Sequence, residues 1–126
     1  RNRLSPRLNA LIDEGLGISD SDLARGLEKQ EQLARELDAF LSAFDGLITP
    51  PALGEAPADL TQTGDPAFCT IWSLCGVPAV TIPTGRGPAG LPLGLQLVAP
   101  RLADDRLLSV ALWCDERVGW GQRIVD

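Results

Sequence analysis

The strongest constraint on the fold comes from two extended apolar segments that flank a glycine-rich loop. The first, "PAVTIPT", is rich in the β-branched residues that favour strands. The second, "LPLGLQLV", carries leucine at every second position, which is the period of a strand with two different faces. Pro92 and Gly94 argue against a helix in this second segment. The sequence therefore predicts two strands, at 79–83 and 93–98.

The loop between these strands, "GRGPAG" at 85–90, fits the pattern G-x-G-x-x-G, which can hold the pyrophosphate of a dinucleotide. Such a loop requires a helix that opens at its last glycine, so that the helix N-terminus faces the phosphates. A strand is expected there instead. We therefore interpret the loop as a strand-to-strand connection, and we predict neither NAD nor any other cofactor.

The amino-terminal third of the chain is predicted to be helical. An amphipathic helix is expected at 19–44, with a start that resembles a capping box formed by Ser19 and Asp22. A shorter helix at 4–14 precedes it and is expected to end at Gly15. The apolar residues of the longer helix recur at helical spacing, namely Leu23, Leu27, Ala34, Leu37, Leu41 and Phe44.

Two further helices are predicted in the second half of the chain. The helix at 66–75 has clear boundary signals: Asp65 as a cap, Pro66 at the first helical position and Gly76 just past the end. The last helix is expected at 104–118, where apolar residues again share one side.

The order of these elements indicates an α/β fold. "DGLITPP" at 45–51 reads as a short strand stopped by paired prolines, which gives the order α, α, β, α, β, β, α. This order suggests helices packed on a mixed β-sheet. Nearly unbroken apolar strands are typical of sheet centres that are covered on both faces, and three strands make a small sheet. We therefore expect residues 1–126 to form one partial domain, with 1–44 as a helical lead-in and 45–120 as the sheet and its helices.

Composition excludes several classes of protein. A net charge of −6 argues against a nucleic-acid partner or an anionic membrane surface, since such binding depends on Lys and Arg. No apolar run approaches the roughly 20 residues that span a bilayer, and the first ten residues lack the apolar core of a signal peptide. We predict a soluble cytoplasmic protein. The chain starts with Arg1 and has no methionine, which suggests a piece of a longer protein.

Cysteine and histidine usage limits the chemistry. Cys69, Cys75 and Cys114 form no CxxC pair, so we expect reduced thiols packed as small apolar residues. The chain has no histidine, which removes the usual base of serine and cysteine hydrolases and the commonest zinc ligand. We predict no metal site, and a hydrolase that contained this chain would need a different base.

Three segments follow one another along the chain: "DGLITPP", "TGDPAFCTIWSLCGVPAVTIPTG" and "GLPLGLQLVAPRLADDRLLSVALWCDE". Together they resemble the carboxy-terminal part of amidase signature family enzymes, over residues 45–120. The resemblance implies an α/β/α fold and hydrolysis or transfer at a carboxamide by a serine nucleophile, with a second serine and a lysine in place of histidine.

The resemblance also implies that the catalytic residues lie upstream of this chain. The chain has no Ser-Ser pair, and its only lysine, Lys29, lies among charged residues on a helix face, as a solvated surface charge would. We predict no catalytic residue here and no activity for this chain alone.

The helix at 66–75 is the candidate for substrate binding. Spacing places Phe68, Ile71, Trp72 and Cys75 on an apolar side and Pro66, Cys69, Thr70 and Ser73 on a more polar stripe. In relatives, positions that match Pro66 and Thr70 face the substrate, so we predict Pro66, Thr70 and Ser73 as substrate-binding residues. Alternatively, Thr70 and Ser73 bond to carbonyls within the helix. Many relatives have asparagine at the position of Ser73, so a role that depends on that amide cannot be transferred to this chain.

Gln96 could line a cavity or form hydrogen bonds at a strand edge, and we favour the edge.

These observations leave three hypotheses for function. The first is the C-terminal part of an amidase that acts on a small-molecule amide. The second is a non-catalytic binding or interaction domain that uses the amidase sheet, and the third is a structural scaffold. In each case, sheet edges without neighbours are expected to allow self-association.

Overall fold

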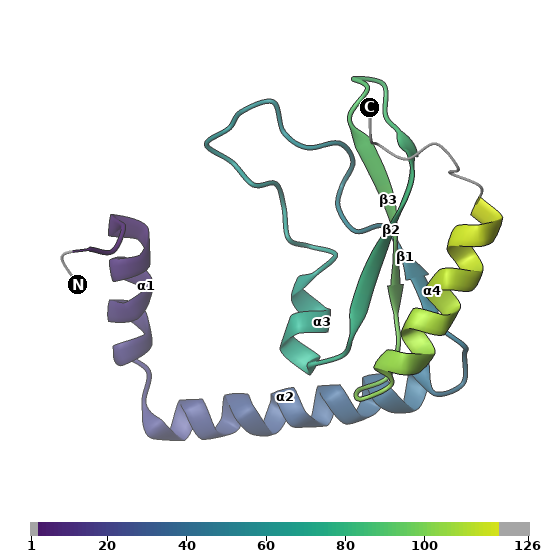
Figure 1. The fold of residues 1–126 in the computed structure, drawn as a ribbon. Helices are drawn as coiled ribbons and strands as arrows, with labels where there is room; N and C mark the ends of the chain where they lie inside the picture. The colour runs from purple at the N-terminus through teal and green to yellow at the C-terminus, as the bar shows by residue number, and fades with distance from the viewer. Residues whose placement is uncertain (1–2, 119–126) are drawn as a thin grey trace. The chain divides into compact units, whose positions relative to one another are not determined.

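The computed structural model describes residues 3–118, which form two compact units. One unit ends at Gln32 and the other begins at Leu33, within the same long helix. Figure 1 shows the elements in chain order. They are α1 (Pro6–Leu16), α2 (Asp20–Leu41), β1 (Leu47–Thr49), α3 (Thr70–Cys75), β2 (Ala79–Arg86), β3 (Pro92–Val98) and α4 (Asp104–Val118).

The first unit contains α1 and the first half of α2. Ser5 caps α1 by accepting a hydrogen bond from the Leu8 N–H at 3.2 Å, and Pro6 occupies the first turn. The helix continues past the predicted end at Gly15 to Leu16, because Gly17 provides the C-cap. At α2, the Ser19 hydroxyl accepts the Asp22 N–H at 3.1 Å and donates to the Asp22 carboxylate at 2.6 Å, which confirms the predicted start.

The sheet lies in the second unit and has the strand order β1–β3–β2. Both pairings are antiparallel: Gln96 of β3 faces Thr49 of β1 and Thr81 of β2. The α/β class is confirmed. Parallel pairs, which a mixed sheet would include, do not occur among the strands of residues 3–118. β3 is therefore the central strand, and β1 and β2 are the edges of this sheet.

The two faces of the sheet are covered by different helices, as Figure 1 shows for α3 and α4. Leu97 of β3 belongs to the cluster on the α4 side, which comprises Ile82, Leu97, Ala99, Leu107, Ala111 and Cys114. Val98 belongs to the cluster on the side of α3 and the end of α2, which comprises Ala34, Leu41, Cys75, Val77 and Val98. Neighbouring residues of a strand point to opposite faces, so the predicted period of two is realised as two separate cores.

The regular part of α3 is shorter than the predicted helix at 66–75, because it begins only at Thr70. Asp65 does act as a cap, since its Oδ1 accepts the Ala67 N–H at 2.9 Å. The residues it caps form a turn that leads directly into α3, because the Pro66 carbonyl accepts the N–H groups of both Cys69 at 2.8 Å and Thr70 at 3.0 Å. The predicted end is confirmed: Gly76 has a φ of 66°, the left-handed conformation that glycine adopts most easily.

The glycine-rich loop joins β2 to β3, as predicted, so it is the tip of a hairpin. The Gly87 N–H donates to the Leu91 carbonyl at 2.9 Å and closes the turn. The Glu55 carboxylate occupies the loop, where it accepts the N–H groups of Ala89 at 3.0 Å and Leu91 at 2.7 Å. A side chain, rather than a helix N-terminus, thus uses these backbone donors.

The cysteines and the helices agree with two further expectations. All three cysteines are free thiols, and Cys75 and Cys114 are buried, as expected of small apolar residues. None of the helices among residues 3–118 combines the length and the apolar character needed to cross a bilayer. The final helix, α4, has the predicted bounds.

Candidate functional site

A cavity of about 630 Å³ lies beside α3 in the second unit. It is bounded by α3, the turn into β2, the central strand and the start of α4. Its lining residues are Cys69, Trp72, Ser73, Gly76, Val77, Pro78, Ala79, Gln96, Leu102 and Asp104. The polar groups in this lining are a thiol, a hydroxyl, an indole N–H, an amide and a carboxylate. The thiol, the indole and the amide already bond within the protein, so the Ser73 hydroxyl and the Asp104 carboxylate are the side-chain groups that could bind a small polar molecule.

The predicted substrate-binding residues occupy different positions around this cavity. Ser73 is exposed and lines it. Pro66 and Thr70 are also exposed, but they are not among the residues that line it. The Thr70 hydroxyl donates to the Pro66 carbonyl at 2.9 Å, as the alternative interpretation of this residue proposed. This bond ties the two residues together at the start of α3.

Gln96 lines the same cavity and is 5% exposed. The predicted position at a strand edge is wrong, because β3 is the central strand of the sheet. The expected hydrogen bonding is present: Gln96 Oε1 accepts from Thr49 Oγ1 at 2.9 Å and from Trp72 Nε1 at 2.8 Å. The sequence signal for this arrangement was a single polar residue in an otherwise apolar strand.

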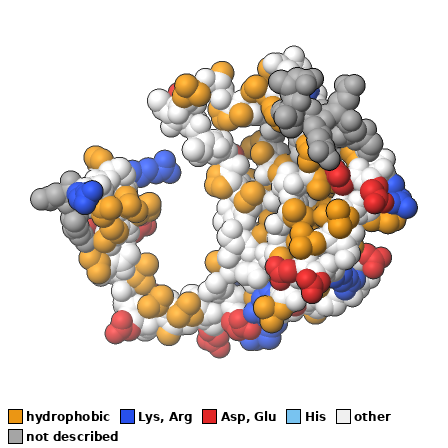
Figure 2. Space-filling model, viewed as in Figure 1, with side chains coloured by type: hydrophobic (Ala, Val, Ile, Leu, Met, Phe, Trp, Pro, Cys, Tyr) orange, Lys and Arg blue, Asp and Glu red, His pale blue; other side chains and the backbone are white. Residues whose placement is uncertain are grey.

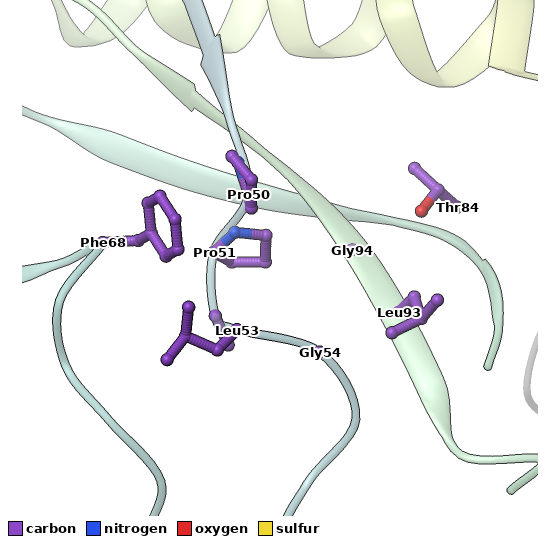
Figure 3. A pocket seen from close by; sticks show the side chains of 9 residues that line it. Pro50, Pro51, Leu53, Gly54, Phe68, Thr84, Leu93 and Gly94 are labelled. Atoms are coloured by element: carbon purple, nitrogen blue, oxygen red, sulfur yellow. The ribbon is translucent and has the colours of Figure 1, made fainter. Parts of the chain in front are cut away.

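A second cavity, of about 410 Å³, is formed mainly by apolar residues. Figure 3 shows Phe68 beside Pro51 and Leu53, with Thr84 and Leu93 contributed by β2 and β3. Phe68 was predicted to share one apolar side with three other residues of its helix. Because it precedes the regular part of α3, its half-buried ring lies at this cavity rather than in either buried cluster. The contribution of residues 50–54 to a cavity was not predicted.

A third cavity, of about 420 Å³, lies between β1 and α4. Ile48 and Trp113 line it, and both are more than half exposed. Leu112 of α4 is 66% exposed, and Figure 2 shows hydrophobic side chains at the surface. This face of the sheet has no covering layer beyond α4 among residues 3–118.

Four of the serine hydroxyls among residues 3–118, those of Ser5, Ser19, Ser42 and Ser109, serve local structure. Those of Ser42 and Ser109 donate to carbonyls four residues earlier in the chain, at 2.7 and 2.8 Å. Ser5 and Ser19 cap helices. Lys29 is exposed on α2, as predicted, and no hydrogen bond joins it to a serine within residues 3–118. Histidine, cysteine and acidic residues form no group of three that could hold a metal ion in the same residues.

Comparison with known families and proteins gives consistent matches. The family model described as Amidase matches residues 2–108. The A subunit of the mitochondrial glutamyl-tRNA(Gln) amidotransferase of Aedes aegypti is 30% identical over 108 residues, which are 79% of this chain and 22% of that protein. The corresponding protein of Zymomonas mobilis is 32% identical over 111 residues, 82% of this chain and 23% of that protein. The chain spans about a fifth of the length of these relatives.

Solved structures give the same result for the fold. A crystal structure titled as that of an amidase superposes with a TM-score of 0.75 at 26% identity, over 92% of this chain and 29% of the other. The A subunit of the glutamyl-tRNA(Gln) amidotransferase of Thermotoga maritima superposes with a TM-score of 0.51 at 23% identity, which supports a common fold. In both cases the matched region is a minor part of the larger protein.

Proposed function

The chain belongs to the amidase family, and on this premise we propose that it is the C-terminal part of an enzyme that hydrolyses a carboxamide. The family match over residues 2–108 carries this proposal. The three segments that resemble the family in sequence form one sheet with its covering helices, which supports a common origin of the fold.

The catalytic residues are proposed to lie in the complete protein outside this chain, as a Ser-Ser-Lys triad. A serine nucleophile needs a base within hydrogen-bonding distance and backbone N–H groups directed at the developing oxyanion. The hydroxyls of Ser5 and Ser19 cap helices, and those of Ser42 and Ser109 donate to backbone carbonyls. Lys29 is solvent exposed. This chain would therefore be inactive alone.

The proposed contribution of this chain is part of the substrate pocket. Ser73 borders the cavity of about 630 Å³, and Pro66 and Thr70 are exposed just before and at the start of the same helix. We assign these three residues to contacts with the acyl or amine part of a small amide.

The expectations of no cofactor, no nucleic acid and no membrane partner remain part of this proposal. A cytoplasmic location is also proposed, although the Aedes aegypti relative is named as mitochondrial.

A second candidate is one subunit of an amidotransferase, because the curated relatives at 30 and 32% identity carry that name. Such a protein would transfer the amide nitrogen to an acceptor instead of releasing it to water. The two candidates differ in what the complete protein does alone, since a hydrolase needs no second protein to release ammonia from a simple amide.

The experiment is an ammonia-release assay of the complete protein with aliphatic, aryl and glutamine amides. The hydrolase proposal expects turnover of at least one simple amide by the purified protein alone. Transfer of the amide nitrogen to an acceptor, observed only when a partner protein is present, would favour the amidotransferase. Absence of both turnover and serine labelling by a fluorophosphonate would support the binding-domain or scaffold alternatives.

A further inference from the structure

Gln96 is the only buried polar residue among residues 3–118. It lies on the central strand, on the face that packs against α3, and no apolar side chain of similar volume could form its hydrogen bonds. A buried amide is stable only when its donors and acceptors are satisfied, so the residues around it have restricted positions.

The orientation of the Gln96 amide follows from its partners. The indole N–H of Trp72 can only donate, so the Gln96 atom at 2.8 Å from it must be the oxygen. The Thr49 hydroxyl donates to the same oxygen at 2.9 Å. The amide nitrogen is therefore turned toward Cys69, whose sulfur it approaches at 3.7 Å.

Cys69 extends this network from the sheet to the start of α3. Its thiol donates to the Pro51 carbonyl at 3.4 Å while its sulfur accepts from Gln96. Its backbone N–H donates to the Pro66 carbonyl at 2.8 Å, and its own carbonyl accepts the Ser73 N–H at 3.2 Å. One half-buried cysteine thus connects the central strand with the backbone of two predicted substrate-binding residues.

We propose that Gln96 is a positioning residue for substrate recognition, which acts through Cys69. It would hold the turn of Pro66 to Thr70 in the one orientation in which these residues contact the amide substrate. This inference rests on the proposed function and adds to it: specificity would depend on a buried amide that does not itself need to touch the substrate. A residue with a purely structural role would lower stability without changing the order of substrate preference.

The test uses the complete protein with four variants. Gln96→Met removes the hydrogen bonds of the amide to Thr49, Trp72 and Cys69. Cys69→Ala removes the connection from Gln96 to the turn, together with the bond of the thiol to the Pro51 carbonyl. Cys69→Ser restores a donor and an acceptor at that position. Leu97→Ala is the control, because Leu97 is fully buried on the same strand but packs on the α4 side.

Two measurements are made at a temperature at which every variant is folded. The first is hydrogen exchange of the backbone amides from Ala67 to Thr70, which is independent of activity. The second is kcat/KM, resolved into kcat and KM, for amides with small and bulky acyl groups. If Gln96→Met does not fold, the comparison of Cys69→Ala with Cys69→Ser still tests whether the contact between Gln96 and Cys69 holds the turn.

The proposal expects faster exchange at Ala67–Thr70 in Gln96→Met and Cys69→Ala, and about a tenfold change in the ratio of kcat/KM between the two amides. The change should lie mainly in KM, and Cys69→Ser and Leu97→Ala should keep the wild-type order of preference. Unchanged exchange in both disruptive variants would overturn the proposal, as would faster exchange with an unchanged preference. If the wild-type protein hydrolyses no amide, the proposed function fails while the exchange data still test the coupling.

Discussion

Asp38 and Arg101 form a two-point ion pair that joins the end of α2 to the loop after β3. Asp38 Oδ1 accepts the backbone N–H of Arg101 at 2.8 Å, and Oδ2 accepts the side-chain Nε–H at 2.5 Å. The side chains are 25% and 31% exposed. Partial burial raises the pKa of Asp38, but the hydrogen bonds and charge of Arg101 outweigh this effect, so the pKa lies below its ordinary value.

Asp38→Asn is therefore expected to lower the free energy of unfolding at pH 7 by about 1 to 2 kcal/mol. A carboxyl group whose pKa is lower in the folded state stabilises the fold fully above its unfolded pKa of about 3.9, and this contribution is lost as the pH falls through the folded pKa. The difference between wild type and variant should thus shrink below about pH 4. Urea unfolding of both proteins at several pH values measures this difference.

The control for this prediction is Asp45→Asn. Asp45 approaches Arg106 at 3.5 Å, but its side chain is 97% exposed, so solvent screens the pair. This variant should unfold like the wild type at neutral pH. An equal loss of stability in both variants would show that the Asp38 pair contributes no more to the free energy of unfolding than an exposed ion pair does.

A second prediction concerns Glu55 and Gly87. A Cβ atom at Gly87 would clash with Glu55 Cδ, so Gly87→Ala must displace the carboxylate from the N–H groups of Ala89 and Leu91. We expect Gly87→Ala and Glu55→Ala each to destabilise the protein by about 1 kcal/mol. The double variant should cost little more than either single variant, because both remove the same interaction. Thermal unfolding of the four proteins measures this coupling, and strictly additive losses would contradict it.

Much of the fold could be predicted from the sequence because the signals were local. The alternation in "LPLGLQLV" determined which residues of β3 reach each core, and Gly76 and Ser19 marked helix ends through their own backbone or side-chain chemistry. The extent of α3 was not predictable in this way. Pro66 is compatible both with the first position of a regular helix and with a turn that precedes one. The contacts of Cys69 with Pro51 and Gln96 involve residues 18 and 27 positions away.

The candidate site shows the same limit. The polar stripe was found from spacing alone, and Ser73 does line a cavity. The position of Gln96 depended on strand order, which local patterns do not specify, since β3 could have been an edge or the centre of the sheet. The cavity around Phe68 needed the path of residues 50–54, which has no periodic signal.

The third prediction concerns chemistry. Residues 1–126 alone should hydrolyse no amide or ester, because the chain has no histidine as a base and its single lysine, Lys29, is exposed on α2. Ser5, Ser42 and Ser109 cap a helix or bond to helix carbonyls. Incubation with a fluorophosphonate probe should leave the serines unlabelled by mass spectrometry. Stoichiometric labelling of one serine would contradict the assignment of the catalytic residues to another segment.

The fourth prediction is that the isolated chain self-associates. β1 is a sheet edge, and Ile48 on it is 56% exposed, close to Trp113 at the same cavity. Light scattering after size exclusion should show species larger than the monomer, and ANS fluorescence should rise. Ile48→Lys should reduce the association, since edge lysines oppose strand pairing. Thr61→Lys is the control for added charge, because Thr61 is exposed outside the sheet. A monodisperse wild-type monomer without ANS binding would contradict the prediction.

The last prediction tests Thr70 in the complete protein. If Thr70 contacts the substrate in the complete protein, Thr70→Phe should reduce the space for the acyl group at that contact. It should lower kcat/KM for bulky acyl groups more than for small ones, by about 1 to 3 kcal/mol of transition-state stabilisation. Thr70→Val separates bulk from the lost hydrogen bond to Pro66, because it removes the hydroxyl at nearly constant volume.

Thr70→Val should therefore keep the wild-type order of preference. Ile71→Ala provides the contrast for stability, since Ile71 packs against the buried cluster on the α3 side and its truncation should cost about 2 kcal/mol of unfolding free energy. Phe68 is less suitable for this purpose because it lies at a cavity. An equal loss of activity toward small and bulky amides in Thr70→Phe, or the same reordering in Ile71→Ala, would assign Thr70 a structural role only.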